Sequence, residues 1–150
     1  MENDVLVNNT EILVVEDNPS DAELTLRALK RRGVVNNIFV VRDGEEALEF
    51  IFHNGRYTER KETLPLKVIL LDLKLPKVSG LEVLAKIKSD EETKKIPVVV
   101  VTSSHEDTDL KKAYELGVNS YIVKPMEFES FVRSIGEAGM YWLALNETTK

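Results

Sequence analysis

Short apolar runs alternate along the chain with longer segments whose apolar residues recur at helical spacing. Five runs have the length and the β-branched content of strands, at residues 11–16, 38–41, 68–71, 98–101 and 120–123. Continuous apolar runs of this length are typical of strands that are buried on both faces of a sheet. The pattern therefore predicts five buried strands.

The segments that follow these runs predict five helices. The first is expected from Ser20, because Ser20 and Glu23 match a capping box. Further helices are expected to open at residues 43–46 and at 79–82, to end at Gly117, and to run from about 127 to 145. The polar segment from residue 54 to about 66 is longer than most connections, which indicates a lid or a contact loop.

Strands that alternate with helices predict an α/β fold with a doubly wound parallel sheet, covered by helices on both sides. We expect the flavodoxin-like strand order 2-1-3-4-5. The length of 150 residues suits a single domain. We expect this domain to span residues 11–145, between an N-terminal tail of residues 1–10 and a C-terminal tail of residues 146–150.

Composition and charge exclude several classes of protein. The formal charge of -6 argues against a nucleic-acid surface, and the basic run 30–32 suits the end of a helix. No apolar run approaches the roughly 20 residues that a membrane span needs, and the N-terminus lacks the pattern of a signal peptide. The chain has no cysteine, which excludes disulfides and thiolate metal sites. We therefore expect a cytoplasmic protein with neither a nucleic-acid nor a membrane partner.

Polar residues follow the ends of the predicted strands. Ligands of open parallel sheets bind outside the carboxyl ends of the strands. Five residues would meet there if the strand order is 2-1-3-4-5, namely Glu16, Asp17, Asp72, Thr102 and Lys124. These strand ends are therefore the candidate site.

Three carboxylates in one pocket repel one another by on the order of 4 kcal/mol per close pair at an effective dielectric near 20. A hard divalent cation such as Mg²⁺ would offset this repulsion, and it commonly binds carboxylates together with phosphate oxygens. The ammonium of Lys124 and the hydroxyl of Thr102 are donors that suit a phosphoryl group. Asp72 is the natural phosphoryl acceptor if Glu16 and Asp17 hold the metal.

Five sequence motifs resemble the successive signatures of the receiver domains of two-component response regulators. They are Val-Val-Glu16-Asp17-Asn18, Leu-Leu-Asp72-Leu-Lys-Leu-Pro76, Ser79-Gly80-Leu81, Val-Val-Val101-Thr102-Ser103 and Tyr121-Ile-Val-Lys124-Pro125. The resemblance spans roughly residues 11 to 138, with every motif in the right order and at the expected strand end.

The resemblance implies a role for each site residue. It implies that Asp72 is the phosphoacceptor, that Glu16, Asp17, Asp72 and the backbone carbonyl of Lys74 bind Mg²⁺, that Lys124 contacts the phosphoryl group, and that Thr102 and Tyr121 are the switch residues. A cis peptide bond is expected before Pro125. The phosphoryl group would come from a phosphohistidine of a partner sensor histidine kinase and leave by attack of water. No other enzyme activity is implied.

The finer resemblance is to the small response regulators paired with bacterial and cyanobacterial phytochromes. It depends on the insert at residues 53–57 and on the final helix, which ends in Met140-Tyr-Trp-Leu143. Phosphorylation would switch the surface formed by the fourth helix, the fifth strand and the fifth helix. Because only five residues follow residue 145, output is expected through a protein contact. The aromatic cluster at 141–145 predicts a homodimer through the C-terminal helix.

Three other functions compete with this interpretation. An aspartate-dependent phosphatase usually has a second acid two residues after the first, where this chain has Lys74. A flavin- or nucleotide-binding module would need a glycine-rich phosphate loop after the first strand, and none is present. A phosphorylation-independent adaptor could use the same fold only as a docking surface.

Overall fold

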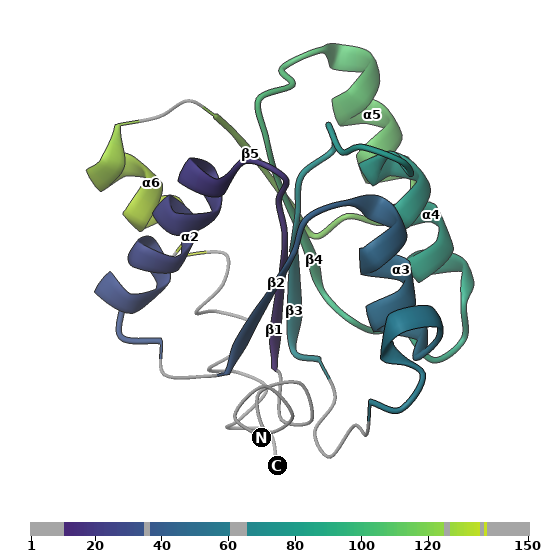
Figure 1. The fold of residues 1–150 in the computed structure, drawn as a ribbon. Helices are drawn as coiled ribbons and strands as arrows, with labels where there is room; N and C mark the ends of the chain where they lie inside the picture. Colours follow the sequence, from purple (N-terminus) through teal and green to yellow (C-terminus); the bar gives the residue numbers. More distant parts are fainter. Residues whose placement is uncertain (1–10, 35–36, 61–65, 125–126, 136, 138–150) are drawn as a thin grey trace.

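The computed structural model describes residues 11–34, 37–60, 66–124, 127–135 and 137 of the chain. Within these ranges, strands alternate with helices in an α/β fold (Figure 1). The strands are β1 (Ile12–Val15), β2 (Ile38–Val41), β3 (Val68–Leu71), β4 (Val98–Thr102) and β5 (Ser120–Val123). The helices are α2 (Pro19–Arg31), α3 (Gly44–Phe52), α4 (Gly80–Ser89), α5 (Asp107–Glu115) and α6 (Phe128–Ile135), with a short 3-10 helix η1 (Gly55–Tyr57) after α3.

The five strands form one parallel sheet in the order β2-β1-β3-β4-β5. This confirms the predicted doubly wound topology. Val15, the last residue of β1, is aligned with Val41 of β2 and with Leu71 of β3. The residues that follow β1 and β3 therefore emerge side by side at the same edge of the sheet.

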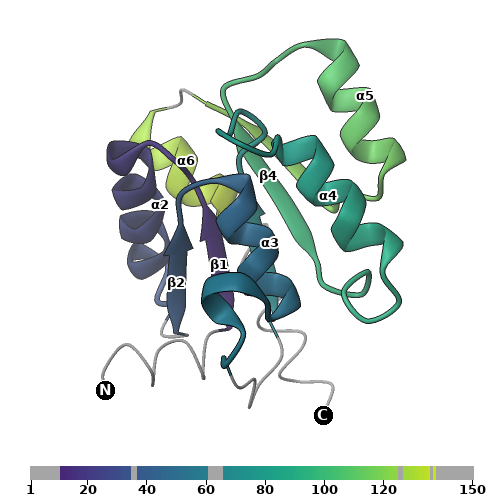
Figure 2. The same cartoon turned by 45° about the vertical axis from the view of Figure 1, so that its right-hand side comes forward.

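Helices cover both faces of the sheet. Figures 1 and 2 show α2 and α6 on one side, and α3, α4 and α5 on the other. Successive strand residues point to opposite faces, so Leu13 and Val15 pack toward α3 and α4, while Ile12 and Val14 pack toward α2 and α6. Both faces of the central strands are therefore buried, as the continuous apolar runs predict.

Side-chain caps fix where the helices begin. The predicted capping box at Ser20 and Glu23 is wrong, because α2 begins earlier: the Asn18 side chain accepts a hydrogen bond from the Asp21 backbone N–H at 3.0 Å. Asn is a strong N-cap residue, and Pro19 after it has the backbone angle that the first helical position requires. The predicted starts of α3 and α4 are confirmed. Asp43 and Ser79 cap them.

The described part of the polar segment that follows α3 packs against that helix. Arg60 is buried, its guanidinium lies 4.1 Å from the centroid of the Phe50 ring, and its Nη2 donates to the Phe50 carbonyl at 2.6 Å. The Tyr57 hydroxyl donates to Glu46 Oε2 at 2.6 Å. The rest of the predicted lid, residues 61–65, lies outside the described residues.

Two further predictions fall outside the described residues. The predicted last helix begins as α6, but the aromatic cluster of the predicted dimer surface lies beyond residue 137. The predicted cis bond before Pro125 also lies outside them. Among the helices that are described, none has the length and apolar character of a membrane span.

Candidate functional site

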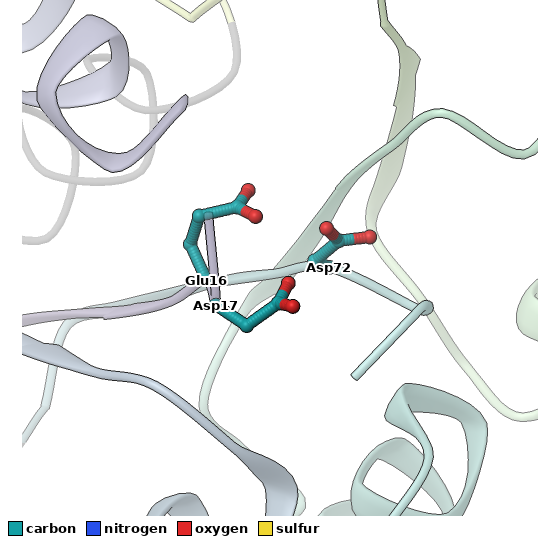
Figure 3. Close-up of side chains that lie close together, drawn as sticks. All are labelled: Glu16, Asp17 and Asp72. Carbon is teal, nitrogen blue, oxygen red and sulfur yellow. The ribbon is translucent and has the colours of Figure 1, made fainter. Parts of the chain in front are cut away.

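Three carboxylates converge where β1 and β3 end. Glu16 and Asp17 directly follow β1, and Asp72 directly follows β3 (Figure 3). Each residue offers a carboxylate oxygen, and these three oxygens all lie within 4.8 Å of one another. Glu16 and Asp72 are buried, whereas Asp17 is exposed. The site is therefore open to solvent on the side of Asp17.

Lys124, at the end of β5, reaches into this acidic cluster. Its Nζ donates to Glu16 Oε1 at 2.8 Å and lies 3.4 Å from Asp72 Oδ2. A third contact, at 2.8 Å, is with Oδ2 of Asp21 in the first turn of α2. Asp21 is a site residue that the sequence analysis missed. Acids are common in the first turn of a helix because they favour its dipole, so nothing in its position marked it out.

The charges in the cluster are not balanced. The pKa of Glu16 is raised to about 7, chiefly by burial and further by the Asp72 charge, against the opposing hydrogen bond from Lys124. Burial lowers the pKa of Lys124, but its hydrogen bonds to Asp21 and Glu16 outweigh this effect and raise the pKa above its ordinary value. One permanent ammonium therefore faces four carboxylates, and the cluster retains an excess of negative charge.

The donor set fits a hard divalent cation. Carboxylate oxygens are the ligands that Mg²⁺ and Mn²⁺ prefer, and Mg²⁺ usually keeps several waters alongside one or two of them. The cluster contains no histidine or cysteine among its described members. The backbone N–H of Lys74 donates to Asp72 Oδ1 at 3.1 Å, which turns the chain after β3 around the Asp72 side chain.

Gly80 holds α4 close to the backbone of Asp72. A Cβ atom at position 80 would lie 2.2 Å from the Asp72 carbonyl oxygen and 2.5 Å from Leu73 Cα, well inside contact distance. The Gly80 N–H donates to the Leu73 carbonyl at 3.0 Å. The glycine in the Ser79-Gly80-Leu81 motif therefore permits the close approach that fixes the turn after β3.

The two predicted switch residues both bond to Ser104, in the loop after β4. Thr102 is fully buried, and its Oγ1 accepts a hydrogen bond from the Ser104 N–H at 3.3 Å. The Tyr121 hydroxyl donates to the Ser104 carbonyl at 3.0 Å, and burial raises the pKa of Tyr121. The sequence placed Thr102 and Tyr121 on neighbouring strands, but it did not indicate that one residue links them.

The sequence matches a known protein family. The family model of the response regulator receiver domain matches residues 12–136. The chain therefore belongs to the response regulator receiver family, whose mechanism is phosphorylation on an aspartate. The family predicted from the five motifs is confirmed.

Two relatives are similar over most of their length. The probable methanogenesis regulatory protein FilR2 of Methanothrix harundinacea is 46% identical over 138 residues, which are 91% of this chain and 86% of the relative. Response regulator Rcp1 of Synechocystis is 38% identical over 132 residues, which are 88% of each protein.

Solved structures of phytochrome response regulators share the fold. The phosphorylated cyanobacterial phytochrome response regulator RcpA has a TM-score of 0.81 at 38% identity, over 91% of this chain and 96% of that one. The bacteriophytochrome response regulator RtBRR has a TM-score of 0.74 at 53% identity, over 85% of this chain and 76% of that one. The Mn²⁺-bound form of Rcp1 has a TM-score of 0.76 at 39% identity, over 83% of this chain and 90% of that one. The predicted kinship with phytochrome response regulators is thus confirmed.

Proposed function

We propose that this response regulator accepts a phosphoryl group on Asp72 from a sensor histidine kinase, with a divalent cation bound beside it. The observation that carries the proposal is the convergence of Asp72 with Glu16, Asp17 and the Lys124 ammonium at one sheet edge. Family membership supports the reaction class, and the geometry supports Asp72 as its acceptor. Glu16 and Asp72 are both buried and both contact Lys124, whereas Asp17 is exposed. The motif directly after β3 favours Asp72 over Glu16.

Glu16, Asp17 and Asp72 would hold the cation, together with the backbone carbonyl of Lys74 as the resemblance implies. Among the similar structures, Rcp1 is in its Mn²⁺-bound form and RcpA is phosphorylated. We propose Mg²⁺ as the working ion of this chain. When bound, it would neutralise charge on the carboxylates and on the phosphoryl oxygens.

The chain's own residues then have distinct tasks. An Asp72 carboxylate oxygen attacks the phosphorus of the kinase phosphohistidine, so that an O–P bond forms while the N–P bond breaks. Lys124 donates to one phosphoryl oxygen, and the Thr102 hydroxyl donates to another. Attack by water later releases inorganic phosphate and restores the carboxylate. The chain is thus a phosphoacceptor that also loses its own phosphoryl group.

Phosphorylation would change the surface formed by α5, β5 and α6. Thr102 would move toward the phosphoryl group, and Tyr121 would turn inward into the space that Thr102 leaves. The partner kinase is proposed to be phytochrome-like, because the similar structures are of phytochrome response regulators. A homodimer through the C-terminal helix is proposed from the sequence; a sedimentation mass of one chain at high concentration would contradict it.

The test is the intact mass after incubation with acetyl phosphate and MgCl₂. We expect the wild type to gain one phosphoryl group that is labile in base. Asp72→Ala and wild type with excess EDTA should gain none. Asp107→Ala, which removes an exposed acid from α5, is the matched control and should gain one. A gain on Asp72→Ala equal to that of the wild type would place the acceptor elsewhere, and partner binding unaffected by Asp72→Ala would favour the adaptor.

A further inference from the structure

Ser104 is the meeting point of three elements around the phosphoryl site. It is 5% exposed. Its N–H bonds to Thr102 and its carbonyl to Tyr121, as described above, while its hydroxyl donates to Asp109 Oδ2 at 2.5 Å. Asp109 lies in the first turn of α5. The two switch residues are therefore connected to this helix through one serine and one carboxylate.

Asp109 also reaches the loop that follows Asp72. Its Oδ2 lies 3.8 Å from Lys74 Nζ, and the Lys74 N–H bonds to Asp72 Oδ1. The Asp109 side chain is only 20% exposed, whereas that of Lys74 is 56% exposed. The serine bond is thus the better sheltered of the two contacts. The serine bond is also the shorter, at 2.5 Å against 3.8 Å, so we assign the main attachment to Ser104.

The rest of α5 is weakly anchored. Ala113 is its one buried residue, whereas α2, α3 and α4 each bury four. Two of its large apolar side chains point to solvent, with Leu110 38% and Tyr114 51% exposed. A helix with so little buried surface has little resistance to displacement. The position of its first turn therefore depends strongly on the bond between Asp109 and Ser104.

We propose that Asp109 is the positioning residue that transmits the phosphorylation state of Asp72 to α5. The inference rests on the proposed function. Movement of the Thr102 hydroxyl toward a phosphoryl group displaces Ser104, to which it is bonded, and the Asp109 carboxylate carries this displacement into the first turn of α5. Without the carboxylate, the pocket still accepts the phosphoryl group, but α5 does not respond.

The experiment measures intact mass and amide hydrogen exchange on the same samples, with and without acetyl phosphate and MgCl₂. In the wild type, we expect phosphorylation to change exchange in α5 by at least about fivefold, the lower end of typical coupling between sites. Asp109→Ala should gain the phosphoryl group and lose this change. Asp107→Ala, which removes an acid from the same turn, should keep it. Asp109→Asn retains an oxygen that can accept from Ser104 and should restore most of the response.

The outcomes separate the inference from the proposed function. A phosphorylated Asp109→Ala protein whose α5 amides respond as in the wild type would overturn the role of Asp109. So would an equal loss in Asp107→Ala, because the effect would then come from helix charge. If the wild type gains no phosphoryl group, the proposed function fails and the inference fails with it. A phosphorylated wild type whose α5 amides do not change overturns the inference alone.

Discussion

The Lys124 ammonium neutralises part of the charge of the carboxylates even in the absence of a phosphoryl group. Its side chain is 10% exposed and makes ion pairs with Glu16, Asp21 and Asp72. Removing one partner from a buried set of charges typically costs about 3–5 kcal/mol, because the remaining charges are left buried without compensation. Asp21 is partly open to water, which reduces the share that its own pair contributes.

Replacing Lys124 therefore tests the electrostatics of the site separately from phosphorylation. We expect Lys124→Met to lower the free energy of unfolding by about 3 kcal/mol in EDTA, because Glu16 and Asp72 lose their buried counter-ion. Saturating Mg²⁺ should recover part of this loss. Urea denaturation with and without Mg²⁺ measures both values. Lys74→Met, at an exposed lysine, is the control, and it should change stability by less than about 1 kcal/mol; equal losses in the two variants would contradict the assignment.

At the residue scale, the sequence predicted the strand-end residues but not their partners. Glu16, Asp17, Asp72 and Lys124 each follow an apolar run, so strand register alone brings them together. Asp21 and Asp109 lie in the first turns of helices, where an acid has an ordinary explanation. The contact of Asp21 with Lys124 joins elements far apart in the chain, and that of Asp109 with Ser104 depends on the path of the loop between β4 and α5. The periodicity of apolar residues records neither contact.

At the scale of elements, α4 and the turn after β3 form one unit through Gly80. The turn carries Asp72 at its start, and α4 begins where a side chain would collide with the Asp72 and Leu73 backbone. The sequence predicted the cap at Ser79 from local spacing. The need for glycine after it comes from a tertiary contact. The start of α2 was mispredicted for a local reason, because Asn18 and Pro19 begin a helix better than Ser20 does.

Gly80→Ala should displace α4 from the site. We expect a loss of about 1–3 kcal/mol in unfolding free energy, as for other overpacked positions, and slower phosphorylation because the turn that holds Asp72 must shift. Denaturation and the time course of mass gain with acetyl phosphate measure the two effects. Gly33→Ala is the control, because Gly33 has a φ of +83° but an added Cβ there meets nothing within 4 Å. We expect this variant to lose about 1–2 kcal/mol of stability from its backbone conformation and to be phosphorylated at the rate of the wild type. Unchanged phosphorylation in Gly80→Ala would contradict this role.

At the scale of the whole molecule, the acidic cluster links two central strands, so its charge state affects global stability. The two helical layers follow from the periodicity of the sequence, and the sheet order was predicted as that of the receiver fold. The excess of negative charge in the cluster was not predicted, because it depends on the burial of Glu16 and on the contact of Asp21 with Lys124. Glu16, with its pKa raised to about 7, is the residue through which pH acts on this imbalance.

The ion-free protein should lose stability as pH rises from about 4.5 to about 7. Over this interval folded Glu16 holds a proton that the unfolded chain, with its ordinary pKa of 4.5, has released, so folding is favoured below the interval and that contribution disappears above it. We expect a loss of about 1–3 kcal/mol in EDTA, measured by urea denaturation between pH 5 and 7.5. With Mg²⁺ present the loss should shrink, because the cation binds the ionised carboxylate.

Glu16→Gln should flatten the EDTA profile relative to the wild type, whereas Glu115→Gln, at an exposed position of α5, should leave the slope of the profile unchanged. Profiles of equal slope in Glu16→Gln and the wild type would show that Glu16 ionises at its ordinary pKa, and that the excess charge of the cluster lies on its other carboxylates.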